Sequence, residues 1–313
     1  MPQTFRIATF NCENLFRRFL FKNHSSAEAE RAIREGFILD RRLLTTHMKK
    51  ARKITARAVK AVKADVLALQ EVENLDALRH FNTRFLNSRY KYQLVIDGND
   101  PRAIDVGILS RYPFGRIRTH QFDKKSPRAR SKIFSRDCLE VEILLSRKKS
   151  LTLFVNHFKS MMGGRSQTMA RRREQTTRVA RIIAERYGSN PAKAKFVILG
   201  DFNDYYEGAN LTHPSHGLSP LLGKAWLVDV NLRIKKPQNR WAHFWAKKKE
   251  YRQLDYILLS KSLAKANPTA VPKIERRGLP KRATKVTRKR FPRVGDNTPK
   301  ASDHCPVVIA LKI

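Results

Sequence analysis

Short apolar runs recur along almost the whole chain, and they constrain the fold more than any other feature. Their length and their content of β-branched residues are typical of strands rather than helices. The runs are Val66–Leu69, Tyr92–Ile96, Val106–Leu109, Leu139–Leu144, Leu151–Val155, Phe196–Leu199, Tyr256–Leu259 and Pro306–Leu311. Two longer segments, about Leu43 to Lys63 and about Ser166 to Arg186, have the spacing of amphipathic helices. Many strands with a few interspersed helices predict a layered α/β domain.

Neither an internal repeat nor a Pro-, Gly- or Ser-rich linker divides the chain, so we expect a single domain over residues 1–313. Two stretches are typical of loops. Lys22 to Arg34 is polar and could hold a short helix within an insertion. Pro272 to Pro299 is dense in Lys, Arg and Pro. We expect this basic loop, which lies between two polar motifs, to reach a substrate, although a solvated loop is the alternative.

The charge balance is unusual. The chain has 65 Lys and Arg residues against 27 Asp and Glu, a formal net charge of +38. Such an excess costs self-repulsion, which a polyanionic partner would offset. Nucleic acid is the first candidate for that partner, and an anionic membrane surface is the second. Adaptation for solubility is a third explanation, but added positive charge serves solubility poorly.

The cysteines indicate a reducing compartment. Cys12, Cys138 and Cys305 are too scattered for a disulfide framework or a zinc site, and each lies in an apolar run, so we expect buried thiols. The N-terminus enters a strand pattern directly, without a secretory leader. No apolar stretch is long enough to span a bilayer. We therefore expect a cytoplasmic protein, or a secreted one if a signal has been removed.

Polar residues stand where several apolar runs end, which is where loops hold functional groups on a rigid scaffold. Asn11 offers a carbonyl oxygen suited to a hard cation, with a strand cap as the alternative. Glu71 ends a buried run and needs a partner, either a divalent metal or a salt bridge. In Gly200-Asp201-Phe202-Asn203, Phe202 would point away, so that Asp201 and Asn203 face one site. A plain Asp/Asn turn is the competing interpretation.

Two histidines also stand at the boundaries of apolar runs. His157, Lys159 and Ser160 cluster at a strand end and could together bind a phosphate, although a lone histidine is more often part of a core. His304 can exchange a proton near neutral pH. Asp303 beside it can contact a metal.

Asp255 precedes an apolar run. A carboxylate there can orient a histidine and stabilise its charged form, and a cap is the alternative role. Taken together, the polar blocks form an inventory of oxygen ligands plus two histidines without a thiolate cluster. That inventory favours Mg²⁺, with Mn²⁺ or Ca²⁺ as other choices, over zinc. The sequence has no Walker A motif, no kinase motif set and no Gly-x-Ser-x-Gly elbow.

In order and spacing, these blocks resemble the endonuclease/exonuclease/phosphatase superfamily over nearly the whole chain. The specific motifs are Gln70-Glu71, Gly200-Asp201-Phe202-Asn203, Leu254-Asp255-Tyr256 and Ser302-Asp303-His304. The superfamily includes deoxyribonuclease I, exonuclease III-type nucleases, neutral sphingomyelinases and inositol polyphosphate phosphatases. The resemblance implies a four-layer αββα sandwich, two packed β-sheets flanked by helices, with the site at one end.

The resemblance also implies roles for the motif residues. Glu71 matches the main metal ligand, and Asn11 and Asp303 match residues at or near the metal. Asp201 and Asn203 match the pair that positions the attacking water and the phosphate oxygens. His304 matches the catalytic histidine, Asp255 the carboxylate that orients it, and His157 the second histidine. Arg102 and Asp105 resemble a substrate-facing loop, which would act beside the phosphate-binding candidates Lys159 and Ser160.

His157 matches the deoxyribonuclease I and sphingomyelinase branches, because exonuclease III-type enzymes usually have tyrosine in that region. The implied reaction is in-line attack of water on phosphorus, with the metal neutralising charge on the phosphoryl oxygens. The number of metal ions and the identity of the basic histidine stay open.

The resemblance does not fix the substrate, so we infer the substrate class from the charge of the chain. A nucleic-acid backbone attracts dispersed Lys and Arg through counterion release, whereas an inositol phosphate needs one pocket. A sphingomyelinase would show apolar docking loops, for which Trp241, Phe244 and Trp245 are candidates, although they could stack on bases or join the core. We therefore expect a metal-dependent nuclease of low sequence specificity, acting on DNA ahead of RNA, with no obligate protein partner. A lipid or inositol phosphodiesterase and a non-catalytic nucleic-acid-binding protein are the other candidates.

The dispersed charge consists of three clusters. They are Arg128, Arg130, Lys132 and Arg136; Arg165, Arg171, Arg172, Arg173, Arg178 and Arg181; and Lys281, Arg282, Lys285, Arg288, Lys289, Arg290 and Arg293.

Overall fold

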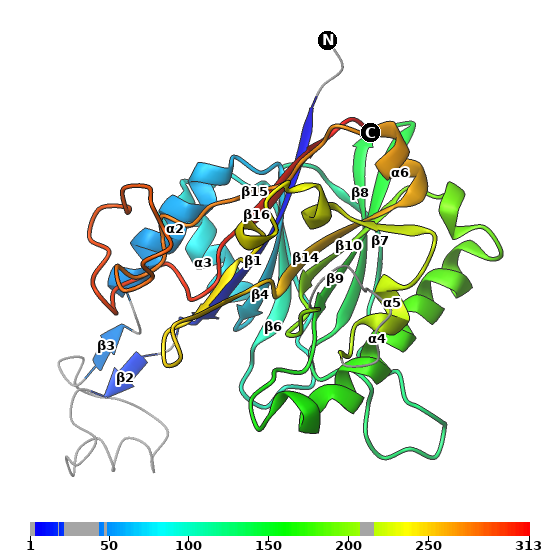
Figure 1. Ribbon diagram of the computed structural model, residues 1–313, viewed down its shortest axis with the longest axis horizontal. Helices are drawn as coiled ribbons and strands as arrows, with labels where there is room; N and C mark the ends of the chain where they lie inside the picture. Colours follow the sequence, from blue (N-terminus) through cyan, green and yellow to red (C-terminus); the bar gives the residue numbers. More distant parts are fainter. Residues whose placement is uncertain (1–3, 18, 22–43, 47–48, 207–215) are drawn as a thin grey trace.

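The computed structural model describes residues 4–17, 19–21, 44–46, 49–206 and 216–313, and the polar segment 22–34 lies outside this range. The described residues form two six-stranded mixed sheets (Figure 1). The first sheet has the order β15 (Lys273–Ile274), β16 (Val307–Leu311), β1 (Phe5–Leu15), β4 (Val66–Val72), β6 (Asp105–Ser110) and β5 (Tyr92–Val95). The second has the order β11 (Leu227–Asp229), β14 (Asp255–Ser260), β10 (Phe196–Asp201), β9 (Lys149–His157), β8 (Cys138–Ser146) and β7 (Phe114–Arg118).

Helices cover the outer faces of both sheets. The helices α2 (Lys49–Val62) and α3 (Leu75–Leu86) lie beside the first sheet, and α4 (Arg165–Tyr187) and α5 (Ser219–Leu222) lie beside the second (Figure 1). The short helix α6 (Lys261–Ala266) follows β14 directly. Two small antiparallel pairs join β2 (Phe19–Phe21) to β3 (Leu44–Thr46) and β12 (His243–Trp245) to β13 (Glu250–Arg252). The expected four-layer αββα sandwich is confirmed.

The alternation of side chains along each strand builds three apolar layers. In β4, Val66 and Ala68 pack between the sheets, whereas Leu67 and Leu69 pack under α2 and α3. Strands buried on both faces read as continuous apolar runs rather than as alternating ones, because each face has its own apolar partner. This is why the runs in the sequence located the central strands correctly.

The structure corrects two helix expectations. The first helix begins at Lys49 rather than near Leu43, because Leu44–Thr46 pairs with β2 as a strand. The sequence reading also missed α3. Its signal was present in Asn74, whose side chain accepts a hydrogen bond from the Ala77 N–H as an N-cap, and in the buried residues Leu78 and Phe81.

The three cysteines are free and buried, as expected. Trp241 and Phe244 are core residues, which removes them as candidates for exposed docking groups. Trp245 is partly exposed and packs under the cationic heads of Lys248 and Arg252. In the part of the chain that the structure describes, no helix combines the length and apolar character needed to cross a membrane.

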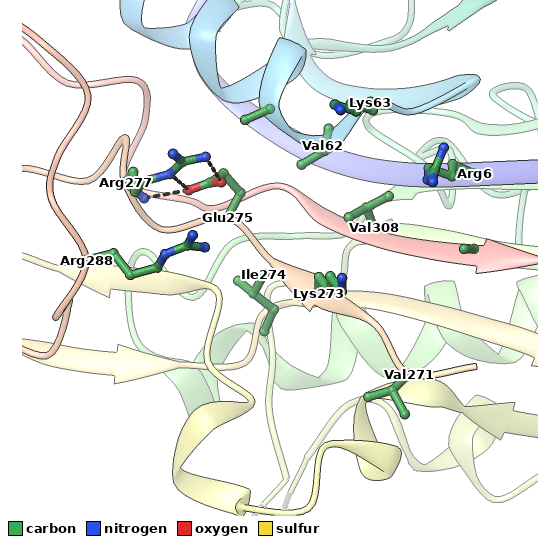
Figure 2. A pocket seen from close by; sticks show the side chains of 12 residues that line it. Arg6, Val62, Lys63, Val271, Lys273, Ile274, Glu275, Arg277, Arg288 and Val308 are labelled. Carbon is green, nitrogen blue, oxygen red and sulfur yellow. Dashed lines mark hydrogen bonds and ion pairs between the residues drawn. The ribbon is translucent and has the colours of Figure 1, made fainter. Parts of the chain in front are cut away.

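The basic segment 272–299 contributes to a cavity of about 410 Å³ on the outside of the first sheet (Figure 2). Arg6, Lys273 and Arg288 line this cavity, and Arg277 is paired there with Glu275. Arg6 lies near the start of β1, on the side away from the end where Asn11 lies. Lys273, Arg277 and Arg288, the cations of the segment that line this cavity, therefore face a surface other than the one at the polar strand ends.

Candidate active site

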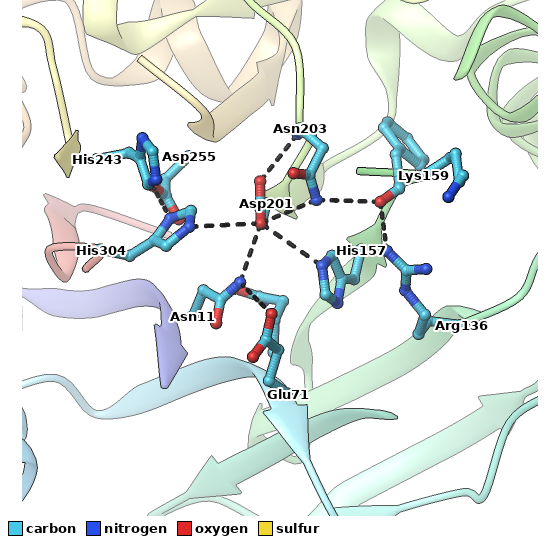
Figure 3. A network of polar contacts seen from close by, with 12 residues as sticks. Asn11, Glu71, Arg136, His157, Lys159, Asp201, Asn203, His243, Asp255 and His304 are labelled. Atoms are coloured by element: carbon cyan, nitrogen blue, oxygen red, sulfur yellow. Dashed lines mark hydrogen bonds and ion pairs between the residues drawn. The ribbon is translucent and has the colours of Figure 1, made fainter. Parts of the chain in front are cut away.

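Strand direction brings the polar strand ends together. β1 runs parallel to β4, and β9 runs parallel to β10. β16 and β14 run antiparallel to β1 and β10, so their first residues lie beside the last residues of those neighbours. Asn11, Glu71 and the segment before β16 therefore share one end of the first sheet. His157, Asp201 and Asp255 share one end of the second, and Figure 3 shows the two groups facing each other.

Asn11 joins the two sheets. Its Nδ2 donates to Oε1 of Glu71 at 3.2 Å and to Oδ2 of Asp201 at 3.0 Å. Its Oδ1 accepts from the Glu13 N–H, so the amide oxygen that we expected to face a metal is engaged in the loop. The other oxygen of Glu71 accepts from the Asn14 N–H at 2.9 Å. Asn11 thus holds two carboxylates close together, and its role as a metal ligand stays a prediction.

The turn after β10 aims Asp201 and Asn203 at the same place. Gly200 has φ of 143°, and a Cβ there would lie 1.9 Å from the Asn156 carbonyl oxygen, so only glycine fits. The Asn203 backbone N–H donates to Oδ1 of Asp201, and its side-chain amide donates to Oδ2 at 3.0 Å. Phe202 is buried among Phe158 and Tyr256. The predicted geometry of this motif is what the structure shows.

His304 is fixed from two sides. Its Nδ1 lies 2.9 Å from Oδ2 of Asp255, and its Nε2 lies 3.8 Å from Oδ2 of Asp201. The Ser302 hydroxyl donates to the Asn11 carbonyl and accepts from the His304 N–H, which ties this loop to β1. The sequence-based pairing of Asp255 with His304 therefore agrees with the geometry (Figure 3).

His157 approaches Asp201 from the opposite side, with Nε2 at 3.5 Å from Oδ2. Its Nδ1 is buried without a hydrogen-bond partner among the described residues. Burial, then the charge of Arg136 and of His304, lowers the pKa of His157 well below the usual value, so this imidazole is neutral. Asp201 accordingly lies between two histidines in different protonation states.

The expected substrate residues are arranged unevenly. Lys159 and Ser160 follow His157 and are partly exposed, and their backbone carbonyls accept from Arg172. The Arg102 side chain is 56% exposed but forms two hydrogen bonds to Asp100. Asp105 corrects an expectation: it is buried and accepts from the Gly98 N–H, so it supports the loop from behind rather than facing a substrate.

The site carries an excess of buried acid. Burial, followed by the charge of Asp303, raises the pKa of Glu71 and raises that of Glu13 to about 7. Burial raises the pKa of Asp201 to about 6, although the His304 charge opposes it. For His304, burial alone would lower the pKa, but Asp255, Asp201 and Asp303 together raise it well above the usual value. His304 is therefore the cationic histidine.

Four of the ten non-glycine residues with positive φ in the described part of the chain lie at the same place. Glu13, Asn14, Glu71 and Asn203 all have positive φ, between 48° and 62°. Non-glycine residues in this region cost of order 1–3 kcal/mol each, and such strain clusters at functional sites.

A hard divalent cation fits the donor set. Glu71, Asp303 and Glu13 bring carboxylates to one cluster in which the charge of Asp303 raises the pKa of its neighbours. Among the residues that the structure describes, Glu13 is the member of this cluster that forms an ion pair with an ammonium group, Lys300 at 2.6 Å. Partly buried like charges of this kind are stabilised by a cation that takes oxygen ligands. Glu71 and Asp303 are the residues that would hold it.

Sequence reasoning missed two members of the site. His243 on β12 packs against His304 with ring centroids 4.6 Å apart and lies 3.9 Å from Asp303. Arg136 is buried and donates to the Phe158 carbonyl and to Asp100. Arg136 was assigned to a basic cluster, but its buried side chain forms hydrogen bonds within the protein. A charged residue close to an apolar run was the only available signal, and it is a weak one.

A family model described as "Endonuclease/Exonuclease/phosphatase family" matches residues 6–312. A sequence search of curated proteins finds no match.

Solved structures share the fold at low identity. Humanized D. rerio TDP2 is 16% identical with a TM-score of 0.57, covering 99% of both chains. Truncated C. elegans TDP2 is 15% identical with a TM-score of 0.60, covering 99% of this chain and 98% of that one. SmcL is 17% identical with a TM-score of 0.59, covering 99% of this chain and 100% of that one.

The family match spans nearly the whole chain, and the αββα sandwich and the polar strand ends agree with it. The chain belongs to the endonuclease/exonuclease/phosphatase family, whose members are generally metal-dependent phosphodiesterases and hydrolases.

Proposed function

We propose that this protein is a divalent-metal-dependent nuclease that hydrolyses phosphodiester bonds of nucleic acid, DNA ahead of RNA, with low sequence specificity. The observation that carries the proposal is the Asp255–His304–Asp201 arrangement facing the Asn11–Glu71 pair across the sandwich. It places a proton-transfer group beside an oxygen-ligand cluster, which is the combination that phosphodiester hydrolysis requires.

Each side chain of the site has its own role in the proposed hydrolysis. Asp255 holds His304 in one orientation and stabilises its charged form, so that Nε2 can donate to a phosphoryl or leaving oxygen. His157, which lies on the other side of Asp201, can supply a second hydrogen bond to the phosphoryl oxygens. Asn203 and Asp201 orient the water and a non-bridging oxygen. A bound Mg²⁺, with Mn²⁺ or Ca²⁺ as alternatives, would neutralise charge on the phosphoryl oxygens.

Charge supports nucleic acid as the substrate. The chain has a net charge of +38, and binding to a polyanion relieves such an excess. A D. rerio TDP2 structure with a single strand DNA product has a TM-score of 0.54 and 16% identity to this chain. Arg136, Arg172 and Arg178 are engaged in internal ion pairs, so the remaining exposed cations are the ones available to nucleic acid.

A second candidate is a sphingomyelinase-like phosphodiesterase. Neutral sphingomyelinases belong to the superfamily that the sequence resembles, and SmcL has the same fold as this chain. One local observation favours this candidate: Met162, five residues after His157, is 78% exposed and would suit an apolar surface.

A substrate panel tests the proposal. Plasmid, single-stranded DNA, RNA and sphingomyelin vesicles are incubated with Mg²⁺ or with EDTA at low and high salt. We expect metal-dependent cleavage of DNA that falls steeply with added salt. Hydrolysis of sphingomyelin alone would select the second candidate. DNA cleavage that is indifferent to salt would overturn the electrostatic argument, and cleavage that persists in EDTA would overturn the metal requirement.

A further inference from the structure

We propose that the cavity on the outside of the first sheet binds the backbone of a nucleic acid at a distance from the reaction centre. The cavity measures about 410 Å³, and four cations in its lining are Arg6, Lys63, Lys273 and Arg288 (Figure 2). We call it, with these four side chains, the rear cavity. This inference rests on the proposed function, because it assigns a second surface to the polymer that the reaction centre hydrolyses.

The charge of the rear cavity is not neutralised within the described part of the protein. Among the described residues, the four cations form no ion pair with a carboxylate. The lining contains one acid, Glu275, and Arg277 holds both of its oxygens, with Nε at 2.9 Å from Oε1 and Nη2 at 2.6 Å from Oε2. The four cations therefore leave an unbalanced positive charge around the cavity, which an anion would neutralise.

The four cations come from separate parts of the chain and are spread along the cavity. They lie on β1, directly after α2, on β15 and in the basic segment. Figure 2 shows Arg288 on one side, Arg6 and Lys63 on the other, and Lys273 between them. A spread of this kind suits the successive phosphates of a nucleic-acid strand better than it suits one compact anion.

Other arginines of the basic segment fix its course. Arg276 donates to the Trp241 carbonyl at 2.9 Å, and Arg290 donates to the Ala283 carbonyl at 2.7 Å. Arg288, between them in the sequence, is exposed at the cavity. A cation on a segment that is already held in place loses less conformational freedom when it binds, so the segment is preorganised for an anion.

Nucleic acid fits this lining better than a membrane does. Val62 and Val308 line the cavity beside the cations, and both are buried. Membrane docking relies on apolar side chains that insert into the bilayer, which buried residues cannot do. A sugar–phosphate backbone can instead place its phosphates on the cations and its sugars over the valines. Such contacts carry no sequence information, in agreement with the low specificity that we propose.

The rear cavity is separated from the reaction centre by the length of a strand. Arg6 precedes Asn11 by five residues on β1, which corresponds to about 16 Å along the strand. A duplex rises about 3.4 Å per base pair, so the polymer must extend over at least about five base pairs to contact both surfaces. The rear cavity therefore raises the affinity for long nucleic acids without taking part in the reaction.

Equilibrium binding in EDTA tests the rear cavity without hydrolysis. A fluorescent duplex of about 30 base pairs is titrated with the wild type and two double variants. The cavity variant is Lys273→Gln with Arg288→Gln. The matched control is Arg147→Gln with Lys148→Gln, in the exposed turn between β8 and β9.

We expect the Kd of the cavity variant at low salt to rise at least about tenfold, and the slope of log Kd against log salt to fall by about two, because two phosphate contacts are lost. The control should change little. Equal Kd values for the two variants would overturn the rear cavity. A polyglutamate peptide that binds through Lys273 and Arg288, with duplex binding unaffected by them, would assign the cavity to an acidic protein segment instead.

Steady-state hydrolysis of the same duplex with Mg²⁺ separates the rear cavity from the reaction centre. We expect KM of the cavity variant to rise at least about tenfold while kcat stays within about twofold of the wild type. A fall in kcat at unchanged KM would overturn the inference, because the substitutions would then act on the reaction. Duplex binding that depends on the cavity without any hydrolysis would overturn the proposed nuclease but support the rear cavity. Hydrolysis with equal binding by both variants would do the reverse.

Discussion

Two buried aspartates, Asp201 and Asp204, lie three residues apart in the sequence and belong to charge clusters that behave in opposite ways. Asp204 follows Asn203 but faces α4, where it pairs with Arg172, and both side chains are 0% exposed. Its oxygens accept from Arg165, Tyr205, Arg172 and Gly217. Each nitrogen of the Arg172 guanidinium also donates a hydrogen bond.

The site around Asp201 has no such balance. Burial raises the pKa of Asp201 to about 6. At Asp204 burial would also raise the pKa, but Arg172 and the Gly217 N–H bring it below the ordinary value. A compensated buried pair becomes costly when one partner is removed, whereas an acid-rich cluster retains the capacity to bind a cation and move a proton.

Removing the proton-transfer group should give the largest effect. We expect His304→Ala and Asp255→Asn to lower the hydrolysis rate about 10²- to 10⁴-fold, because one removes the group and the other its orientation. Steady-state kinetics measures the rate, and DNA binding should change little. Near-normal hydrolysis by either variant would show that this cluster is not the reaction centre.

The Arg172–Asp204 pair should dominate stability instead. Replacing Arg172 by Met leaves the Asp204 carboxylate buried and without its main partner, so we expect a loss of about 3–5 kcal/mol in the free energy of unfolding. Urea denaturation measures this loss. Arg173→Met, on the exposed neighbouring position of α4, is the matched control and should change stability little. Equal effects of the two variants would mean that the buried pair contributes no more than a surface charge.

The two aspartates should give opposite pH dependence in metal-free protein. The depressed pKa of Asp204 means that its contribution to stability is present above its ordinary pKa of 3.8 and is lost as the pH falls. The raised pKa of Asp201 means that its contribution is present below 3.8 and is lost as the pH rises through about 6.

Urea unfolding at several pH values in EDTA compares both Asp→Asn variants with the wild type. The loss in free energy of unfolding caused by Asp204→Asn should become smaller below about pH 4. The free energy of unfolding of Asp201→Asn should rise relative to that of the wild type between about pH 4 and 6. Parallel curves for all three proteins would remove the contrast between the clusters.

Much of the central fold could be predicted from sequence because strands buried on both faces need continuous apolar runs. The runs that became β4, β9 and β10 were located in this way. The first turn of α2 was misplaced because Leu44–Thr46 pairs with β2, and propensity within a segment does not show such a partner. The helix α3 was missed although its cap and apolar spacing were present.

The sequence by itself determined the kinds of chemistry available: carboxylates, amides and histidines at strand ends, in the order of one family. It also indicated the turn at Gly200, because glycine adopts a positive φ without strain, whereas the close approach to the Asn156 carbonyl depends on the pairing of β9 with β10. Tertiary structure alone decided which charged groups are neutralised. Arg136 and Arg172 became internal partners, and His243 arrived beside His304 from a separate pair of strands. The reason is physical: apolar periodicity acts through neighbours along the chain, whereas a pKa or an ion pair depends on groups that only folding brings within a few ångströms.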